Sequence, residues 1–355
     1  MSRPVRRPDH KRRSAVKVFV LNQYNTPLEM VENEIPKPGK DEILLKIHAC
    51  GICQTDLKII RGEIPPPIVT LPQVIGHEIA GEVVEVGEHV ETVKPGDVGT
   101  VYIYSTCHEC EMCLAGRENL CKDLKRIGFE IGGGFSEYIC IPAYNLCPFD
   151  KHLPFEKMAI IGDAIGSSYH AITALACVRP GQDVLIVGAG GLGIHAVQIA
   201  KLCGARVFVA DKDKRALDMA REYGADETLL PDNAPQGIRD LTGGAGVDAV
   251  IEIVGYPETL KWSLPALKSG GKLIIVGYAP DHPFPLNTMA MHYNEYQIMG
   301  SRYLTKRELL QLIHLIEQKK ITPVVTKTYP FVQANEALEA LSQKTTLGRI
   351  VLTFD

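Results

Sequence analysis

The spacing of apolar and polar residues divides the chain into two parts near residue 164. Before that point, short runs of alternating apolar and polar residues are separated by turns with proline and glycine, as around 42–49 and 98–104, and this pattern predicts antiparallel strands. Beyond it, short apolar runs alternate with longer amphipathic stretches, which predicts strands and helices in turn. The first part therefore favours an antiparallel barrel, and the second a parallel, doubly wound sheet.

The elements expected in the second part repeat in a regular order. Strands are predicted at 183–187, 206–210, 227–230, 247–253, 272–276 and 297–300, and helices at 191–203, 213–223, 235–242 and 258–268. Six strands with intervening helices match two mononucleotide-binding halves. A helical face is also predicted at 306–319, and we expect the C-terminal segment after it to return to the barrel.

A glycine-rich segment follows the first of these strands. It reads Gly188-Ala189-Gly190-Gly191-Leu192-Gly193 and leads into a predicted helix. In such a unit the first glycine permits the tight turn, the second lets a pyrophosphate approach the backbone, and the third lets helix and strand pack closely. The free N–H groups at the start of the helix favour an anion. The segment therefore predicts a dinucleotide-binding site.

The choice of dinucleotide is predicted from the end of the second strand. Asp211 follows that strand, and an acidic residue at this point binds the ribose hydroxyls of NAD and repels the 2′-phosphate of NADP. NAD is therefore the expected cofactor. Lys212 is counted with the cofactor-binding candidates, and together with Lys214 and Arg215 it would soften the discrimination.

Four cysteines lie close together in residues 105–123, which we call the four-cysteine lobe. The spacing C-x2-C-x2-C-x7-C is that of the closed tetrahedral set in structural zinc sites, and its members are Cys107, Cys110, Cys113 and Cys121. The alternatives are disulfides or inert buried thiols. Nothing in the sequence looks secreted, so zinc is favoured.

Two further candidate ligands lie upstream of the lobe. Cys53 begins the motif Cys53-Gln54-Thr55-Asp56, and His77 lies in the motif Gly76-His77-Glu78. Each motif alone is a weak signal. A cysteine and a histidine on separate segments are, however, two legs of a catalytic zinc site, which uses three protein ligands and keeps one position open.

These motifs, in this order, resemble those of the zinc-containing medium-chain alcohol dehydrogenases, from around Ala15 to the C-terminus. Gly348-Arg349 adds to the match. The resemblance implies an α/β chain in which a GroES-like β-barrel catalytic domain, residues 14–163 and 306–355, accompanies a Rossmann NAD-binding domain, residues 164–305. It also implies NAD-linked oxidation of a primary or secondary alcohol between the two domains, by a homodimer or homotetramer.

The resemblance assigns a role to each motif residue. Cys53 and His77 would bind the catalytic zinc, and Glu78 would lie beside it as an exchangeable ligand or an outer neighbour. Asp56 would hydrogen-bond the far nitrogen of His77 and fix its tautomer. Thr55 would hydrogen-bond the substrate oxygen and begin the proton path.

The chain departs from the family pattern at three positions. Asp163 stands where many members have a third ligand that is cysteine; some microbial members carry aspartate there, and the alternative is an ordinary capping carboxylate. Lys58 stands where a proton-relay histidine often lies, so either Lys58 or water carries the proton. Gln54 replaces a basic residue. Arg349 is expected near the cofactor phosphates or the zinc carboxylate.

Composition sets outer limits on the function. The chain has 355 residues, 45% of them hydrophobic and 23% charged, with a net charge of −4, which suits a two-domain soluble enzyme and indicates no nucleic-acid or membrane partner. No apolar run reaches the length of a membrane span. Residues 1–13 form a basic segment without an apolar signal region, so a disordered tail and a reducing, cytoplasmic setting are expected.

Other functions on the same scaffold are kept open. The substrate could be a polyol, an amino alcohol or a CoA-linked hydroxyacyl compound, because the residues that line the pocket are not identifiable from the sequence. A zinc-free enoyl reductase is disfavoured by the zinc ligands. A non-catalytic NAD-binding protein is disfavoured by the set Cys53, Thr55 and His77.

Overall fold

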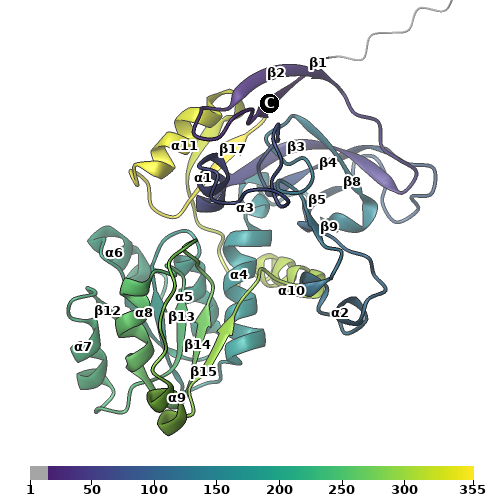
Figure 1. Ribbon diagram of the computed structural model, residues 1–355. Helices are drawn as coiled ribbons and strands as arrows, with labels where there is room; N and C mark the ends of the chain where they lie inside the picture. The colour runs from purple at the N-terminus through teal and green to yellow at the C-terminus, as the bar shows by residue number, and fades with distance from the viewer. Residues whose placement is uncertain (1–14) are drawn as a thin grey trace, which may run out of the picture.

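The computed structural model describes residues 15–355, and the predicted tail 1–13 lies outside the described residues. Figure 1 shows two bodies. The N-terminal strands, in purple and blue, form one body together with the yellow C-terminal elements. The green parallel sheet and its helices form the other, and a teal helical run lies between the two.

Six parallel strands form the sheet of the second body, in the order β12-β11-β10-β13-β14-β15. The order diverges in both directions from β10, the first of these strands in the chain, as in a doubly wound dinucleotide-binding fold. The strands are β10 (Asp183–Val187), β11 (Arg206–Ala210), β12 (Glu227–Leu229), β13 (Val247–Glu252), β14 (Leu267–Ile275) and β15 (Gln297–Gly300). All six predicted strands are confirmed, with β14 starting earlier than expected.

Helices connect these strands, as the alternation predicted. They are α5 (Gly193–Leu202), α6 (Lys214–Glu222), α7 (Ala234–Leu241), α8 (Pro257–Ser263) with η5 (Leu264–Ala266), and α9 (Thr288–Asn294). Helix α6 begins where the side chain of Asp213 accepts a hydrogen bond from the backbone N–H of Arg215, which satisfies one free donor of the first turn.

A long antiparallel strand, β3 (Glu42–Ile52), is the centre of the first body. It pairs with three antiparallel neighbours, β4 (Glu78–Val86), β8 (Tyr138–Pro142) and β17 (Arg349–Thr353). The sheet is completed by β5 (Val98–Val101), β9 (Leu146–Pro148) and β16 (Val325–Pro330). β17, near the C-terminus, therefore lies directly against the central strand of this sheet.

Shorter elements complete the first body. The strand pairs are β1 (Ala15–Val20) with β2 (Glu29–Glu34) and β6 (Tyr104–Ser105) with β7 (Lys125–Arg126). The helices are α1 (Gln54–Ile60), α2 (Glu111–Leu114), α10 (Lys306–Glu317) and α11 (Ala334–Ser342), with the short η1 (Glu118–Leu120), η2 (Ala143–Asn145) and η6 (Phe331–Gln333). Helix α10 starts at a capping box in which Thr305 and Glu308 satisfy each other's backbone N–H groups.

The helical run between the two bodies consists of α3 (Phe155–Ala159), η3 (Ile161–Ile165), α4 (Gly166–Tyr169) and η4 (His170–Ala176). Both η3 and η4 are π-helical turns. The predicted domain boundary between residues 163 and 164 falls inside this run. The boundaries stay predictions.

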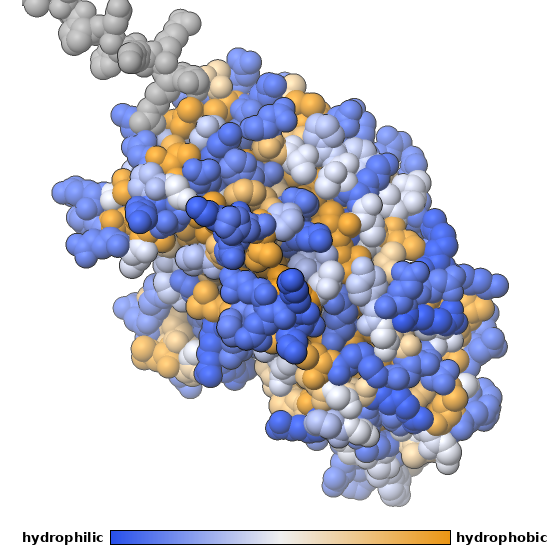
Figure 2. Space-filling view, turned by 180° about the vertical axis from the view of Figure 1, so that it is seen from behind, coloured by the Kyte–Doolittle hydropathy of each residue, from blue (hydrophilic) through white to orange (hydrophobic). Residues whose placement is uncertain are grey.

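Apolar side chains of the strands form much of the core. The central strand β10 is buried from Val184 to Val187, as expected for a parallel sheet covered on both faces. Figure 2 shows blue hydrophilic residues spread over the face seen from behind, with orange hydrophobic residues between them. Within residues 15–355 no helix combines the length and apolarity required to cross a membrane.

Gly193→Ala is expected to destabilise the folded protein, because a Cβ at this position would lie 1.9 Å from the carbonyl oxygen of Gly188. Overpacking of this kind costs about 1–3 kcal/mol. Gly190→Ala is the matched control, since a Cβ there would meet no atom within 4 Å. Thermal unfolding without cofactor measures both variants, and equal melting temperatures would contradict the expectation.

Candidate active site and metal centres

The pairing of β3 with β4 brings Cys53 and His77 together. Gly51, near the end of β3, lies opposite Glu78 at the start of β4. Cys53 follows β3 and caps α1, while His77 directly precedes β4. The two residues are distant in sequence, yet the antiparallel register places them at the same end of the sheet.

Asp56 connects these two residues. Its Oδ2 accepts the backbone N–H of Cys53 at 2.8 Å, which fixes the start of α1. Its Oδ1 lies 3.3 Å from Nδ1 of His77, and both side chains are fully buried. The side chain expected to orient the imidazole is thus beside the far ring nitrogen, and Nε2 is left to face the other candidate ligands.

Asp163 reaches the same place from the helical run. It lies on η3, a π-helical turn, and such turns are frequent at functional sites. Its Oδ2 lies 3.5 Å from Nε2 of His77, and its Oδ1 accepts the hydroxyl of Ser167 at 3.0 Å. Burial raises the pKa of Asp163, but the neighbouring His77 and Arg349 lower it by more. The pKa therefore lies below its usual value, and the carboxylate is charged.

The three candidate ligands form a set that fits a zinc ion. One ligand atom from each of Cys53, His77 and Asp163 lies within 4.8 Å of the others, and all three residues are buried. Nε2 of His77 has no hydrogen-bond partner among the described residues, whereas Nδ1 faces the carboxylate of Asp56. A buried imidazole in that state is costly, and a metal on Nε2 would satisfy it. A thiolate, an imidazole and a carboxylate are a donor set that zinc accepts.

Glu78 and Arg349 form a buried ion pair beside this set. The Nη2 group of Arg349 donates to Oε1 of Glu78 at 2.7 Å and to Oδ2 of Asp163 at 2.8 Å. Oε1 of Glu78 also accepts the backbone N–H of Ala164 at 3.1 Å, which ties β4 to η3. Gly51 leaves the space for this carboxylate, because a Cβ there would lie 1.9 Å from Oε2 of Glu78.

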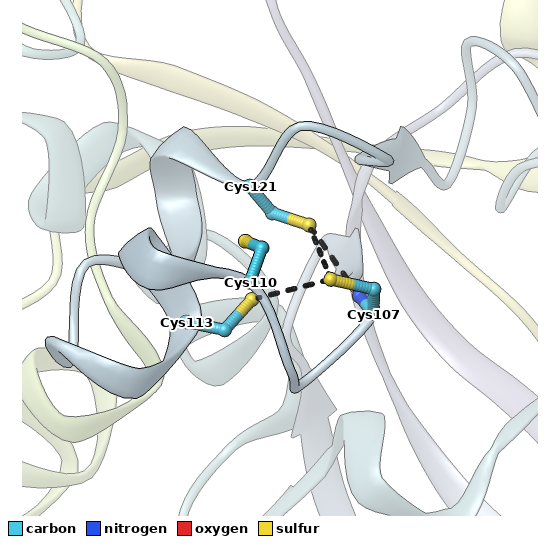
Figure 3. A group of neighbouring side chains, drawn as sticks. All are labelled: Cys107, Cys110, Cys113 and Cys121. Carbon is cyan, nitrogen blue, oxygen red and sulfur yellow. Dashed lines mark hydrogen bonds between the residues drawn. The ribbon is translucent and has the colours of Figure 1, made fainter.

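The four cysteines of the lobe point toward one another (Figure 3). Their sulfur atoms lie within 4.8 Å, with 3.5 Å between Cys107 and Cys121 and 4.0 Å between Cys107 and Cys113. Zinc bound to four sulfurs at its usual bond length would set neighbouring sulfurs about 3.8 Å apart. Backbone N–H groups of Cys113 and Lys122 lower the pKa of Cys110 to about 6, whereas burial and the neighbouring thiols raise the pKa of Cys113 to about 12. The four-cysteine lobe therefore fits a closed metal site.

The glycine loop has the shape expected of a dinucleotide site. Gly188 has φ +95°, which permits the tight turn after β10, and the backbone N–H of Ala189 donates to Oδ2 of Asp211 at 2.7 Å. The space next to Gly190 is open. A Cβ on Gly191 would lie 2.9 Å from Cδ of Arg349, so this arginine lies between the loop and the metal ligands.

Comparison with known proteins identifies the family. The model of the alcohol dehydrogenase GroES-like domain matches residues 39–151, and that of the zinc-binding dehydrogenase matches residues 191–318. The NAD-dependent alcohol dehydrogenase of Sulfolobus acidocaldarius is 33% identical, over 95% of this chain and 99% of its own length. L-Galactonate-5-dehydrogenase of Escherichia coli is 34% identical over 92% of this chain and 95% of its own.

The fold agrees with these matches. The crystal structure of the alcohol dehydrogenase from Aeropyrum pernix superimposes with a TM-score of 0.90 at 31% identity, and covers 95% of this chain and 99% of that one. The chain belongs to the zinc-containing alcohol dehydrogenase family. It is therefore an oxidoreductase with a GroES-like and a Rossmann part, and the zinc and NAD expected from the sequence are the cofactors of this family.

The roles of individual residues in this dehydrogenase stay predictions. The structure brings Cys53, His77, Asp163 and Glu78 together, and it places Thr55 next to them, with Oγ1 3.6 Å from the sulfur of Cys53. The glycine loop lies next to Arg349 at Gly191, and the same loop contacts Asp211 through the backbone N–H of Ala189. Lys212 follows Asp211 at the end of β11.

Aromatic residues around the dehydrogenase site were not predicted. The centre of the Phe129 ring lies 5.3 Å from the centre of the His77 ring, and the centre of the Tyr303 ring lies 6.4 Å from it. Tyr278 follows β14. Burial raises the pKa of its hydroxyl, and the neighbouring hydroxyl of Thr55 lowers it. Only Tyr278 had a usable signal, since ligands of doubly wound sheets bind near the carboxyl ends of the strands.

Lys58 contacts this tyrosine across the two bodies. Its Nζ donates to the backbone oxygen of Tyr278 at 2.5 Å and lies 3.6 Å from the centre of the same ring. Lys58 is on α1, two residues after the Cys53 motif, whereas Tyr278 follows β14 of the sheet that carries the glycine loop. The contact therefore links the candidate metal site with the cofactor-binding sheet. This is a second candidate role for Lys58, besides the proton transfer expected from the sequence.

Lys58→Met is expected to weaken NADH binding about fivefold, because it removes a charge-assisted hydrogen bond and a cation–π contact at the carboxyl end of β14. Lys58→Arg keeps both the charge and the donor and should stay close to the unmodified protein. Fluorescence titration with NADH measures both. Arginine cannot release its proton, so equal loss of turnover in both variants with unchanged NADH affinity would assign proton transfer to Lys58 instead.

Proposed function

We propose that this protein oxidises an alcohol to a ketone or aldehyde, in a site formed by Cys53, His77 and Asp163, and transfers the hydride to NAD. The observation that carries the proposal is the buried set of three metal-ligand atoms within 4.8 Å of one another. Arg349 contacts Asp163 and lies next to Gly191 of the glycine loop, so the candidate metal site and the candidate cofactor site are neighbours.

Cys53, His77 and Asp163 would hold the zinc, with Glu78 as its neighbour. Zinc supplies a Lewis acid that lowers the pKa of a bound alcohol. Arg349 offsets the charge of Glu78, and a divalent ion would balance Asp163 and the thiolate of Cys53. A carboxylate in place of a second thiolate keeps the same ligand charge and donates less electron density, which makes the metal a stronger Lewis acid.

Thr55 is the proposed first proton acceptor. Its hydroxyl lies 3.6 Å from the sulfur of Cys53, on the first turn of α1, and is partly exposed, so it can receive a proton at the candidate ligand set and pass it outward. Asp56 holds the tautomer of His77 through Nδ1. The ring of Phe129 packs against His77 and excludes water from one side of the site.

The glycine loop, Asp211, Lys212 and Arg349 are the proposed cofactor residues. NAD supplies the hydride acceptor. The start of α5 would present backbone N–H groups to the pyrophosphate, and the space next to Gly190 is open. Both oxygens of Asp211 already accept backbone N–H groups, from Ala189 and Asp213, and this fixes the carboxylate where it would meet the ribose hydroxyls.

A polar substrate is the second candidate, in place of a simple alkanol. The hydroxyl of Tyr104 is buried and has no hydrogen-bond partner in the described part of the chain. Its ring lies 5.7 Å from that of Tyr303, which in turn packs against His77. An unpaired buried hydroxyl favours a substrate with further hydroxyls, such as a polyol or an amino alcohol.

We also propose that the protein is a homodimer or homotetramer in a reducing, cytoplasmic setting, with a small alcohol or carbonyl compound as its partner. Strand β15 has a single neighbour in its sheet, and the nearby α9 carries Met289 and Tyr293, which are 64% and 76% exposed. A free strand edge beside apolar side chains favours a second copy. The lobe cysteines must stay reduced to bind zinc.

The zinc-loaded protein is expected to reduce NAD with one class of alcohol and to reduce NADP more slowly, because Asp211 opposes a 2′-phosphate. Absorbance at 340 nm with primary alcohols, secondary alcohols, diols, sugar polyols and threonine measures this. Silence across the panel, with NADH still bound, would contradict the proposal and favour CoA-linked substrates or a non-catalytic protein.

Cys53→Ala and Asp163→Ala are each expected to lower the metal content from two zinc ions per chain to one and to remove most of kcat, because a catalytic site needs three protein ligands. Cys177→Ala is the control, since this cysteine is exposed and lies outside both metal-ligand groups. Metal analysis by mass spectrometry and the rate at 340 nm check this. Full metal content with full turnover in Asp163→Ala would exclude Asp163 as a ligand.

A further inference from the structure

The four-cysteine lobe makes two buried contacts that do not involve its cysteines. Oε1 of Glu118 accepts the backbone N–H of Lys306 at 2.7 Å, and Nδ2 of Asn119 donates to the backbone oxygen of Arg302 at 3.0 Å. Glu118 and Asn119 are 7% and 2% exposed. Both belong to η1, which ends directly before Cys121, a candidate ligand of the lobe.

These contacts reach the segment that joins β15 to α10, and this segment carries Tyr303. Tyr303 has φ +47°, in the left-handed region that a tyrosine rarely adopts. Such a backbone persists only where the surroundings hold it. Its ring lies perpendicular to that of His77, with 6.4 Å between the ring centres, which is a favourable edge-to-face distance.

The two contacts lie on either side of Tyr303. Asn119 holds the residue before it, and Glu118 holds the start of α10 after it. Between them, Leu304 is fully buried and accepts the hydroxyl of Tyr102 on its backbone oxygen at 3.5 Å. The left-handed turn at Tyr303 is therefore fixed from both ends. Two of the three side chains that hold it, Glu118 and Asn119, belong to the lobe, and the third is Tyr102.

We propose that the four-cysteine lobe positions Tyr303 against His77 through Glu118 and Asn119, so that the metal of the lobe supports the geometry of the active site. This rests on the proposed function, because it requires zinc in the lobe and a catalytic metal on His77. Tyr303 would face the substrate, and Glu118 and Asn119 are positioning residues that act through it.

The dependence on the lobe metal follows from the small size of the lobe. Its helix α2 has four residues and no buried side chain, and Leu114 on it is 76% exposed. So little apolar burial cannot order the segment, and a metal shared by four thiolates can. Since Cys121 follows η1 directly, release of the metal would free the two residues that hold the Tyr303 segment.

The first test compares Glu118→Ala with Glu118→Gln. Glutamine keeps an oxygen that can accept the N–H of Lys306, whereas alanine removes it. We expect Glu118→Ala to lower kcat/KM for the alcohol about fivefold, the size of one lost hydrogen bond, and Glu118→Gln to recover most of the loss. Affinity for NADH should be unchanged in both. Equal kcat/KM in the two variants would overturn the role of Glu118.

The decisive test is a double-mutant cycle between Asn119→Ala and Tyr303→Leu, measured as kcat/KM and as the thermal unfolding midpoint. If Asn119 acts through Tyr303, Asn119→Ala lowers kcat/KM about fivefold in the unmodified enzyme and has little further effect in the Tyr303→Leu background. Independent, multiplicative effects on kcat/KM would overturn the proposal, even where both variants lower the midpoint. If Asn119→Ala does not fold, the Glu118 pair replaces it in the same cycle.

Glu109→Gln is the matched control, because Glu109 is an exposed carboxylate in the same lobe. It should leave kcat/KM, the midpoint and the metal content as they are. Metal analysis separates a failure of the proposed function from a failure of the positioning role. An unmodified protein that lacks the catalytic zinc and turnover would overturn the proposed function, whereas two zinc ions per chain with an uncoupled cycle would overturn only the positioning role.

Discussion

A buried arginine between two carboxylates is the interaction on which the rest of the site depends. Arg349 comes from the last strand, Glu78 from β4 and Asp163 from a π-helical turn, so one guanidinium group joins three distant segments. Charges taken out of water are costly unless they are paired, and removal of one partner of such a pair typically costs about 3–5 kcal/mol. The β17–β3 pairing that delivers Arg349 is therefore part of the architecture of the candidate site.

The same arginine connects the candidate metal site with the candidate cofactor site. Its side chain lies against Gly191 while its Nη2 group holds Asp163. Lys58 makes a second connection, from α1 to the segment after β14, and Asn119 makes a third, from the lobe to the segment after β15. Each joins the barrel side to the ends of the parallel sheet. These contacts lie beside an apolar core that the two bodies share.

Much of the fold could be predicted because its signals are local. The six parallel strands are short apolar runs between amphipathic stretches, and the glycine loop specifies its turn through Gly188 and Gly193, where a side chain would be strained or would clash. The four lobe cysteines could be predicted for a related reason, since zinc binds a small set of side chains at restricted spacings, whereas Asp163 was expected only from the family resemblance. Phe129, Tyr303 and the partner of Lys58 could not, because an aromatic residue near a metal has no characteristic spacing.

The sequence by itself determined the doubly wound sheet, the dinucleotide loop and the four-cysteine motif, because each depends on residues close together in the chain. Short local motifs also marked Cys53 and His77 as candidate ligands. Only the tertiary structure decided which atoms face one another. The register of β3 against β4 places Cys53 beside His77, and the π-helical turn brings Asp163 within 3.5 Å of the imidazole. The left-handed turn at Tyr303 depends on contacts with residues 118 and 119, far away in the chain. Such contacts follow from packing between distant segments, which no local pattern of residues encodes.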